Sequence, residues 1–172
     1  MKKTAIALMA ASVIALAVPP YSAGDALVVS PSRSCTAGVR TVGGALERTF
    51  CGPATVSVSV NGRGYKLSQG SCVATPSYIT VNIGVWSAQR TGRKPNYFGL
   101  DVGAVPGTSS PPVRKDGTYK AGISLAFNYS GQSYAVDSLV SPATATLQAD
   151  RTRGTVAGKT ITGQQLTATF HC

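Results

Sequence analysis

The stretch ITVNIGV, residues 79–85, decides the fold class of this chain. Isoleucine or valine occupies every second position and small or polar residues lie between them, which is the period of a β-strand with one buried face. The same period returns in residues 56–60, in residues 119–129, where we expect one long strand, and in residues 166–172. No segment after residue 24 has the 3.6-residue period of a helix. These patterns predict an all-β fold.

Turn residues separate these stretches in the way that antiparallel hairpins require. Asn61-Gly62 is typical of a type I′ turn, and Ser130-Gly131 predicts a second tight turn. Breaks at residues 90–95 and 105–117 predict loops; the second is a surface loop, because the segments on either side are small for separate domains. We expect an antiparallel β-sandwich-like single domain over residues 25–172, closed by disulfides.

The first residues have the layout of a secretory signal peptide. Lys2 and Lys3 precede an apolar run over residues 5–18, and prolines and small residues follow as far as Gly24. A membrane-spanning helix needs about 20 apolar residues, so this run is short for one; a retained N-terminal anchor is the alternative. We expect residues 1–24 to be a signal peptide, no transmembrane segment after its cleavage, and a secreted or cell-envelope protein.

Four cysteines in an exported chain favour two disulfides. They are Cys35, Cys51, Cys72 and Cys172. Three pairings are open, and we favour Cys35–Cys51 as a local loop with Cys72–Cys172 joining an early strand to the last one. The competing interpretation is a metal site, which would need closely spaced cysteine pairs or more histidines than His171 alone. We therefore expect no metal and no cofactor.

Several short segments resemble the mycobacterial 19 kDa lipoprotein antigen family, over roughly residues 60–172. They are GSC at 70–72, ITVNIG at 79–84, FGLDVG at 98–103, ATATLQAD at 143–150 and LTATFHC at 166–172. The resemblance implies an envelope-associated, non-catalytic, antigen-like β protein, in which Cys72 and Cys172 match the family's disulfide pair. The chain departs from the family by lacking a lipobox, since Ser32, Arg33 and Ser34 precede Cys35, and by carrying the extra pair Cys35 and Cys51.

The sequence offers little for catalysis. A nucleophilic triad needs a base, and His171 lies beside a cysteine in the last strand, where alternation points it outward and Cys172 inward. A carboxylate pair could hydrolyse a glycoside without histidine. The carboxylates are Asp25, Glu47, Asp101, Asp116, Asp137 and Asp150. Asp101 and Asp137, which lie in strand-like runs, form the best remaining pair, and we expect the protein not to be an enzyme.

Basic residues suggest the second functional hypothesis. The chain has a formal net charge of +10 with 13% charged residues. Arg90, Arg93 and Lys94 share one loop, Arg114 and Lys115 share another, and a third basic group follows at residues 151–159. If these loops meet at one end of the fold, they form a positive rim for an anionic ligand. Dispersed solubilising charges are the alternative.

The sequence therefore favours a non-catalytic exported or cell-envelope protein of the 19 kDa antigen type. The alternative is a secreted binding module for anionic lipid or polysaccharide through Arg90, Arg93, Lys94, Arg114 and Lys115. A small secreted hydrolase is the third hypothesis. The partners expected are envelope lipid or polysaccharide, or host surface receptors, and no nucleic acid.

Overall fold

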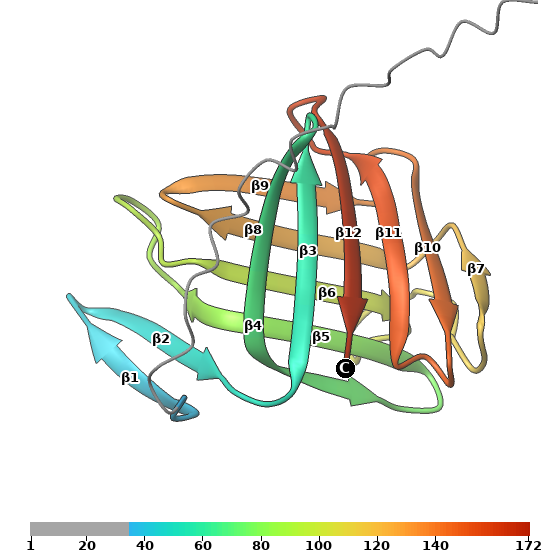
Figure 1. Ribbon diagram of the computed structural model, residues 1–172, viewed down its shortest axis with the longest axis horizontal. Helices are drawn as coiled ribbons and strands as arrows, with labels where there is room; N and C mark the ends of the chain where they lie inside the picture. The colour runs from blue at the N-terminus through green and yellow to red at the C-terminus, as the bar shows by residue number, and fades with distance from the viewer. Residues whose placement is uncertain (1–34) are drawn as a thin grey trace, which may run out of the picture. The chain divides into compact units, whose positions relative to one another are not determined.

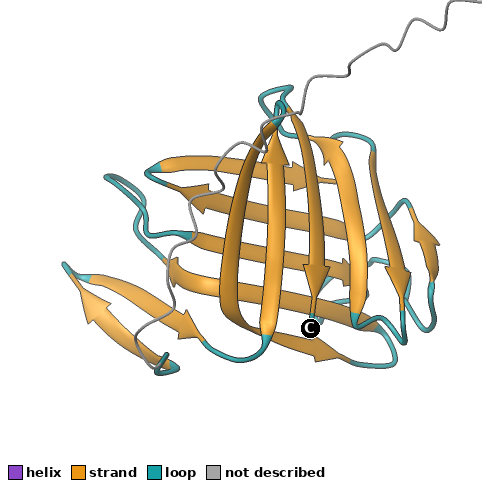
Figure 2. Cartoon of the chain, viewed as in Figure 1, coloured by secondary structure: helices purple, strands orange, loops and turns teal. Residues whose placement is uncertain are grey.

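The described residues, 35–172 of a computed structural model, form twelve β-strands and no helix (Figure 2). The first six are β1 (Gly38–Val42), β2 (Ala45–Phe50), β3 (Ala54–Val60), β4 (Arg63–Ala74), β5 (Tyr78–Ser87) and β6 (Tyr97–Gly103). The last six are β7 (Gly117–Tyr119), β8 (Ile123–Tyr129), β9 (Gln132–Asp137), β10 (Ala143–Gln148), β11 (Arg153–Lys159) and β12 (Gln165–His171). The signal peptide expected over residues 1–24 lies outside the described residues.

All neighbouring strands pair antiparallel in one curled sheet, in the order β7-β10-β11-β12-β3-β4-β5-β6-β8-β9. We call β7, β10, β11, β12, β3 and the start of β4 the front half, and the end of β4 with β5, β6, β8 and β9 the back half. In Figure 1 the front strands run nearly vertically and the back strands nearly horizontally behind them. The all-β, antiparallel fold predicted from the sequence is confirmed.

The two halves are continuous through β4, which differs from a sandwich of separate sheets. The first part of β4 pairs with β3, and residues Ser71–Ala74 pair with β5. Between these parts Gln69 has a φ of 63°, which bends the strand. At Gly70 a Cβ would overlap the Ile83 side chain, so the back half approaches the bend closely. The result is a half-barrel rather than a β-sandwich.

Alternation places the core where the sequence predicts it. In β3 the residues Ala54, Val56, Val58 and Val60 are buried, and in β5 the isoleucines and valine of residues 79–83 are buried. The side chains from the two halves meet between the layers. The largest fully buried ones are Phe98, Phe127, Phe170, Ile79, Ile83 and Leu100.

Both expected hairpin turns are present. Asn61 and Gly62 have φ of 47° and 84°, and Ser130 and Gly131 have φ of 50° and 83°, the pattern of type I′ turns. The prediction of one long strand over residues 119–129 is wrong. Gly122, with a φ of 67°, breaks it, so that β7 pairs with β10 while β8 pairs with β6.

The two disulfides have the pairing favoured from the sequence. Cys35–Cys51 closes a loop of 16 residues beside β2, and Cys72–Cys172 spans 100 residues. The second bridge joins the end of β4, in the back half, to the residue after β12, in the front half. Disulfides of this kind persist in oxidising compartments outside the cytoplasm.

Candidate functional site: a basic and aromatic corner

The two predicted basic loops lie at opposite ends of β5. Arg90, Arg93 and Lys94 follow its last residue, Ser87. Arg114 and Lys115 follow Val113, whose N–H donates to the Ser77 carbonyl at 2.8 Å, just before β5 begins. Ten strand residues separate the two ends by about 30 Å, several times the distance over which exposed charges act at physiological salt. The structure therefore forms no single rim that contains all five residues.

Of the third basic group, Arg151 stabilises the loop at the Arg114 end. The Arg151 guanidinium donates from Nη1 to the Val113 carbonyl at 2.9 Å and also to the Thr75 carbonyl. Its backbone N–H donates to Asp116 Oδ1 at 2.8 Å. Arg151 thus holds the loop that carries Arg114 and Lys115 against the start of β5, and Nη1 of its guanidinium bonds to two backbone oxygens.

Three tyrosines gather where the start of β4 crosses the end of β8 and the start of β9, and we call them the tyrosine cluster. Tyr65 lies with its ring centroid 4.9 Å from that of Tyr129 and 5.4 Å from that of the buried Phe127. Tyr134 stacks on Phe127 at 5.8 Å. All three tyrosines are half-buried, so part of each side chain packs in the protein and part is accessible to solvent. The Tyr134 hydroxyl donates to Gln132 Oε1.

Two arginines flank this cluster. The Arg63 guanidinium lies 5.7 Å from the centre of the Tyr65 ring, within cation–π range. Burial and the adjacent Tyr65 raise the pKa of Tyr134, while the positive charge of Arg63 lowers it. Arg93 reaches the same corner from the loop after β5. A Cβ at Gly131, in the turn between β8 and β9, would lie 3.0 Å from Arg93 Cγ.

A hydrogen bond holds that loop on the same turn. The Ser130 N–H donates to Asn96 Oδ1 at 2.9 Å. We call Arg63, Arg93 and the tyrosine cluster the basic-aromatic corner. Of its members, the sequence singled out Arg93 alone, because the tyrosines alternate in phase with core residues. The sequence signal that could have indicated the corner is Arg63. It lies two residues before Tyr65 and therefore on the same, inward face of β4. A charged side chain is tolerated on that face where no second layer covers it, at the open side of the half-barrel.

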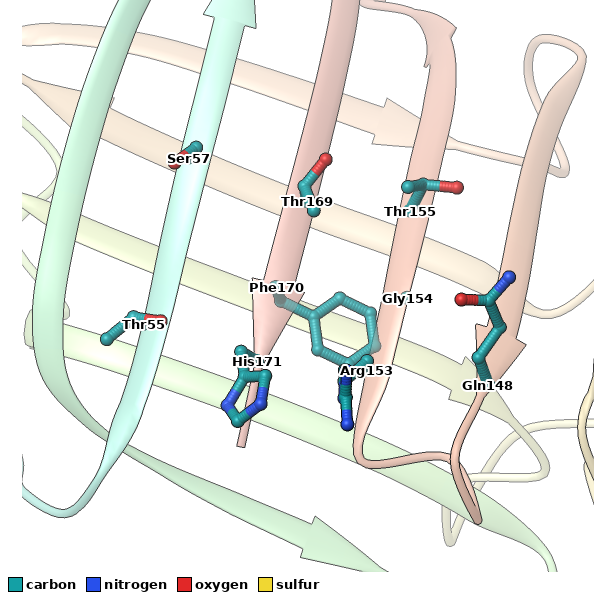
Figure 3. Close-up of a pocket in the computed structure, with 9 residues that line it drawn as sticks. All are labelled: Thr55, Ser57, Gln148, Arg153, Gly154, Thr155, Thr169, Phe170 and His171. Atoms are coloured by element: carbon teal, nitrogen blue, oxygen red, sulfur yellow. The ribbon is translucent and has the colours of Figure 1, made fainter.

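A groove lies on the outer surface of the front half (Figure 3). It has a volume of about 280 Å³ and lies across β3, β12, β11 and β10. His171 pairs with Arg153 on one side and with Thr55 on the other, and the next row along the strands holds Ser57, Thr169 and Thr155. As predicted, the His171 side chain is exposed. The groove offers a cation and several hydroxyl donors to a small anion.

The carboxylate pair Asp101 and Asp137 lies on the outer surface of the back half. Each residue pairs with Ser124 on β8, from opposite sides, so two strand spacings, about 10 Å, separate their backbones. Asp137 Oδ1 accepts the Leu139 N–H at 2.8 Å, so this carboxylate closes the turn after β9. Burial raises the pKa of Asp101 above its usual value.

Beside Asp101, the Tyr97 hydroxyl donates to Asn82 Oδ1 at 2.6 Å. Burial, then the charge of Asp101, raises the pKa of Tyr97 to about 12, whereas Arg48 lowers it. The Tyr97 side chain lies along the strand above Gly99, where a Cβ would overlap its hydroxyl. Tyr97 and Asp137 thus hold hydrogen bonds that stabilise the fold.

Residues 35–172 contain no group of three or more histidine, cysteine, aspartate or glutamate side chains that could hold a metal ion. Over the same residues no helix is long and apolar enough to cross a bilayer. Comparison of the chain with models of protein families, with curated proteins and with solved structures finds no match.

Proposed function

We propose that the protein is an exported, non-catalytic binding protein of the cell envelope or the extracellular medium. This is the kind of protein that the resemblance to the 19 kDa lipoprotein antigen family implies. The two disulfides support an oxidising, extracytoplasmic compartment. We further propose that its ligand is an acidic polysaccharide, bound at the basic-aromatic corner.

One observation carries this proposal: Arg93 packs against Gly131, in the turn that joins the two strands bearing Tyr129 and Tyr134. This contact brings a basic loop to half-buried aromatic rings that Arg63 flanks from the other side. Tyrosine rings pack against the apolar faces of sugar rings, and their hydroxyls bond to sugar hydroxyls. Guanidinium groups bind carboxylates and sulfates in a bidentate manner.

The Arg114 and Lys115 loop lacks such a platform, which is why we assign the ligand to the other end of β5. Tyr119, beside this loop, donates its hydroxyl to the Lys115 carbonyl at 2.6 Å. The loop is also pinned by Arg151 through backbone oxygens. These two arrangements, one with stacked rings and one without, provide a matched comparison within a single chain.

The test uses immobilised heparin as the acidic polysaccharide. The variant Arg63→Gln/Arg93→Gln removes two positive charges at the corner, and Arg114→Gln/Lys115→Gln removes two at the other end. We expect the first variant to bind about tenfold more weakly, because two charge-assisted contacts are lost, and the second to elute close to the wild type. Tyr134→Ala, which keeps every charge, is expected to weaken binding as well.

Equal shifts for the two double variants would overturn the proposal, because net charge alone would then explain retention. Unchanged retention of the Arg63→Gln/Arg93→Gln variant would also overturn it. Near-ultraviolet circular dichroism of each variant shows that the fold is intact.

A further inference from the structure

The β1–β2 hairpin presents an unusual outer face. All five residues of β1 are exposed, and Figure 1 shows the hairpin standing out at the lower left, joined to the sheet through β2. Val39, Arg48 and Trp86 form one row across β1, β2 and β5, and Leu46 follows in the next row. The apolar side chains of these rows are exposed: Val39 by 61%, Leu46 by 48% and Trp86 by 38%.

The opposite face of the hairpin is fixed by an ion pair. Arg40 Nη2 lies 3.0 Å from Glu47 Oε2, and Arg40 Nε donates to the same oxygen at 3.2 Å. This pair neutralises Glu47, the acidic residue of the hairpin, so Arg48 is the charge that the hairpin presents on its outer face. The Arg48 guanidinium lies 5.0 Å from the centre of the Phe50 ring, which keeps it on that face.

A second copy of this chain fits the face poorly. A two-fold contact through it would bring two Arg48 side chains together, between two molecules of a strongly basic chain, whose full sequence has a formal net charge of +10. The carboxylate Asp101, on the outer surface of the back half, pairs with Thr80, about 20 Å along β5 from Trp86. The charge within the apolar row itself is the positive Arg48, which complements a negative partner.

We propose that the outer face of the β1–β2 hairpin docks on an anionic lipid surface. Val39, Leu46 and Trp86 enter the boundary between head groups and acyl chains, where tryptophan is favoured. Arg48 extends to a lipid phosphate, as arginines at membrane interfaces do. The hairpin uses different strands from the basic-aromatic corner, so this inference can succeed or fail independently of the proposed polysaccharide ligand.

Trp86 is the sole tryptophan of the chain and lies in the proposed contact, so its fluorescence reports docking directly. The protein is titrated with vesicles of phosphatidylglycerol mixed equally with phosphatidylcholine, and with vesicles of phosphatidylcholine alone. We expect a blue shift of the Trp86 emission with the anionic vesicles and a much smaller one with the neutral vesicles.

Leu46→Gln is expected to lower partitioning into the anionic vesicles about tenfold, because an exposed apolar side chain no longer enters the lipid. Ile161→Gln is the matched control: Ile161 is 64% exposed in the turn between β11 and β12, and its replacement should leave partitioning unchanged. Both residues are exposed, so both variants are expected to fold.

Three results would overturn the inference. The first is no blue shift with anionic vesicles. The second is an equal loss of partitioning in both variants, which would mean a non-specific apolar effect. The third is a blue shift that depends on protein concentration without vesicles and accompanies a doubled molecular mass, which would assign the hairpin to contact between copies.

Discussion

The Cys72–Cys172 bridge closes a loop of 100 residues and joins the two halves of the half-barrel. On the chain-entropy model, a bridge of that span stabilises the folded state by about 4.7 kcal/mol, and one that closes about 15 residues by about 3 kcal/mol. Cys35–Cys51 spans 16 residues. Each variant, Cys72→Ala/Cys172→Ala and Cys35→Ala/Cys51→Ala, removes two sulfur atoms. The first should therefore lose about 1.6 kcal/mol more than the second.

Equilibrium unfolding in urea, followed by far-ultraviolet circular dichroism, measures this difference. Each double variant is compared with the oxidised wild type, and the slope with urea checks that unfolding remains two-state. Equal losses in the two variants, or a larger loss on removal of Cys35–Cys51, would refute the assignment of the long bridge as the main covalent brace between the halves.

Three further predictions concern Tyr97 and its neighbours. An unfolded tyrosine ionises near pH 10, whereas folded Tyr97 has a pKa of about 12. Between these pH values the unfolded chain loses the proton first, so the free energy of unfolding of the wild type should fall by up to about 3 kcal/mol. In denaturant titrations, Tyr97→Phe should flatten this fall. Because burial raises the pKa of Asp101, its charged form destabilises the fold; Asp101→Asn should raise the melting temperature at pH 7, and the gain should vanish as the pH falls below about 4. Gly99→Ala should destabilise the fold by about 1–3 kcal/mol in urea unfolding by displacing Tyr97 from Asn82, whereas Gly64→Ala, where a Cβ meets nothing within 4 Å, should leave the urea midpoint nearly unchanged.

Local chemistry explains why the strands could be predicted. Alternation in residues 54–60 and 79–83 marks one buried face wherever the strands end up, so the all-β class and most of the core follow from it. Asn61-Gly62 determines its turn because few other dipeptides adopt two successive positive φ angles. The half-barrel could not be predicted from alternation, because it depends on a bend at Gln69 that no local sequence pattern indicates.

The site was harder to predict because it depends on topology. Which end of β5 a loop occupies follows from strand direction and pairing, and the sequence could not show that Arg93 and Arg114 lie at opposite ends. Tyr129 and Tyr134 alternate like core residues and pack on Phe127, yet both are only half-buried at the open corner. Alternation reports the face of a strand, and it does not report how much of that face another layer covers.

The bent strand β4 has a mechanical consequence. In a sandwich of two separate sheets, the layers can slide or part while every backbone hydrogen bond survives. Here β4 is bonded to β3 over its first part and to β5 over its last, so the halves can slide past each other only by breaking one of these ladders. Opening one half therefore exposes the other, and the described residues should behave as a single cooperative unit in hydrogen exchange.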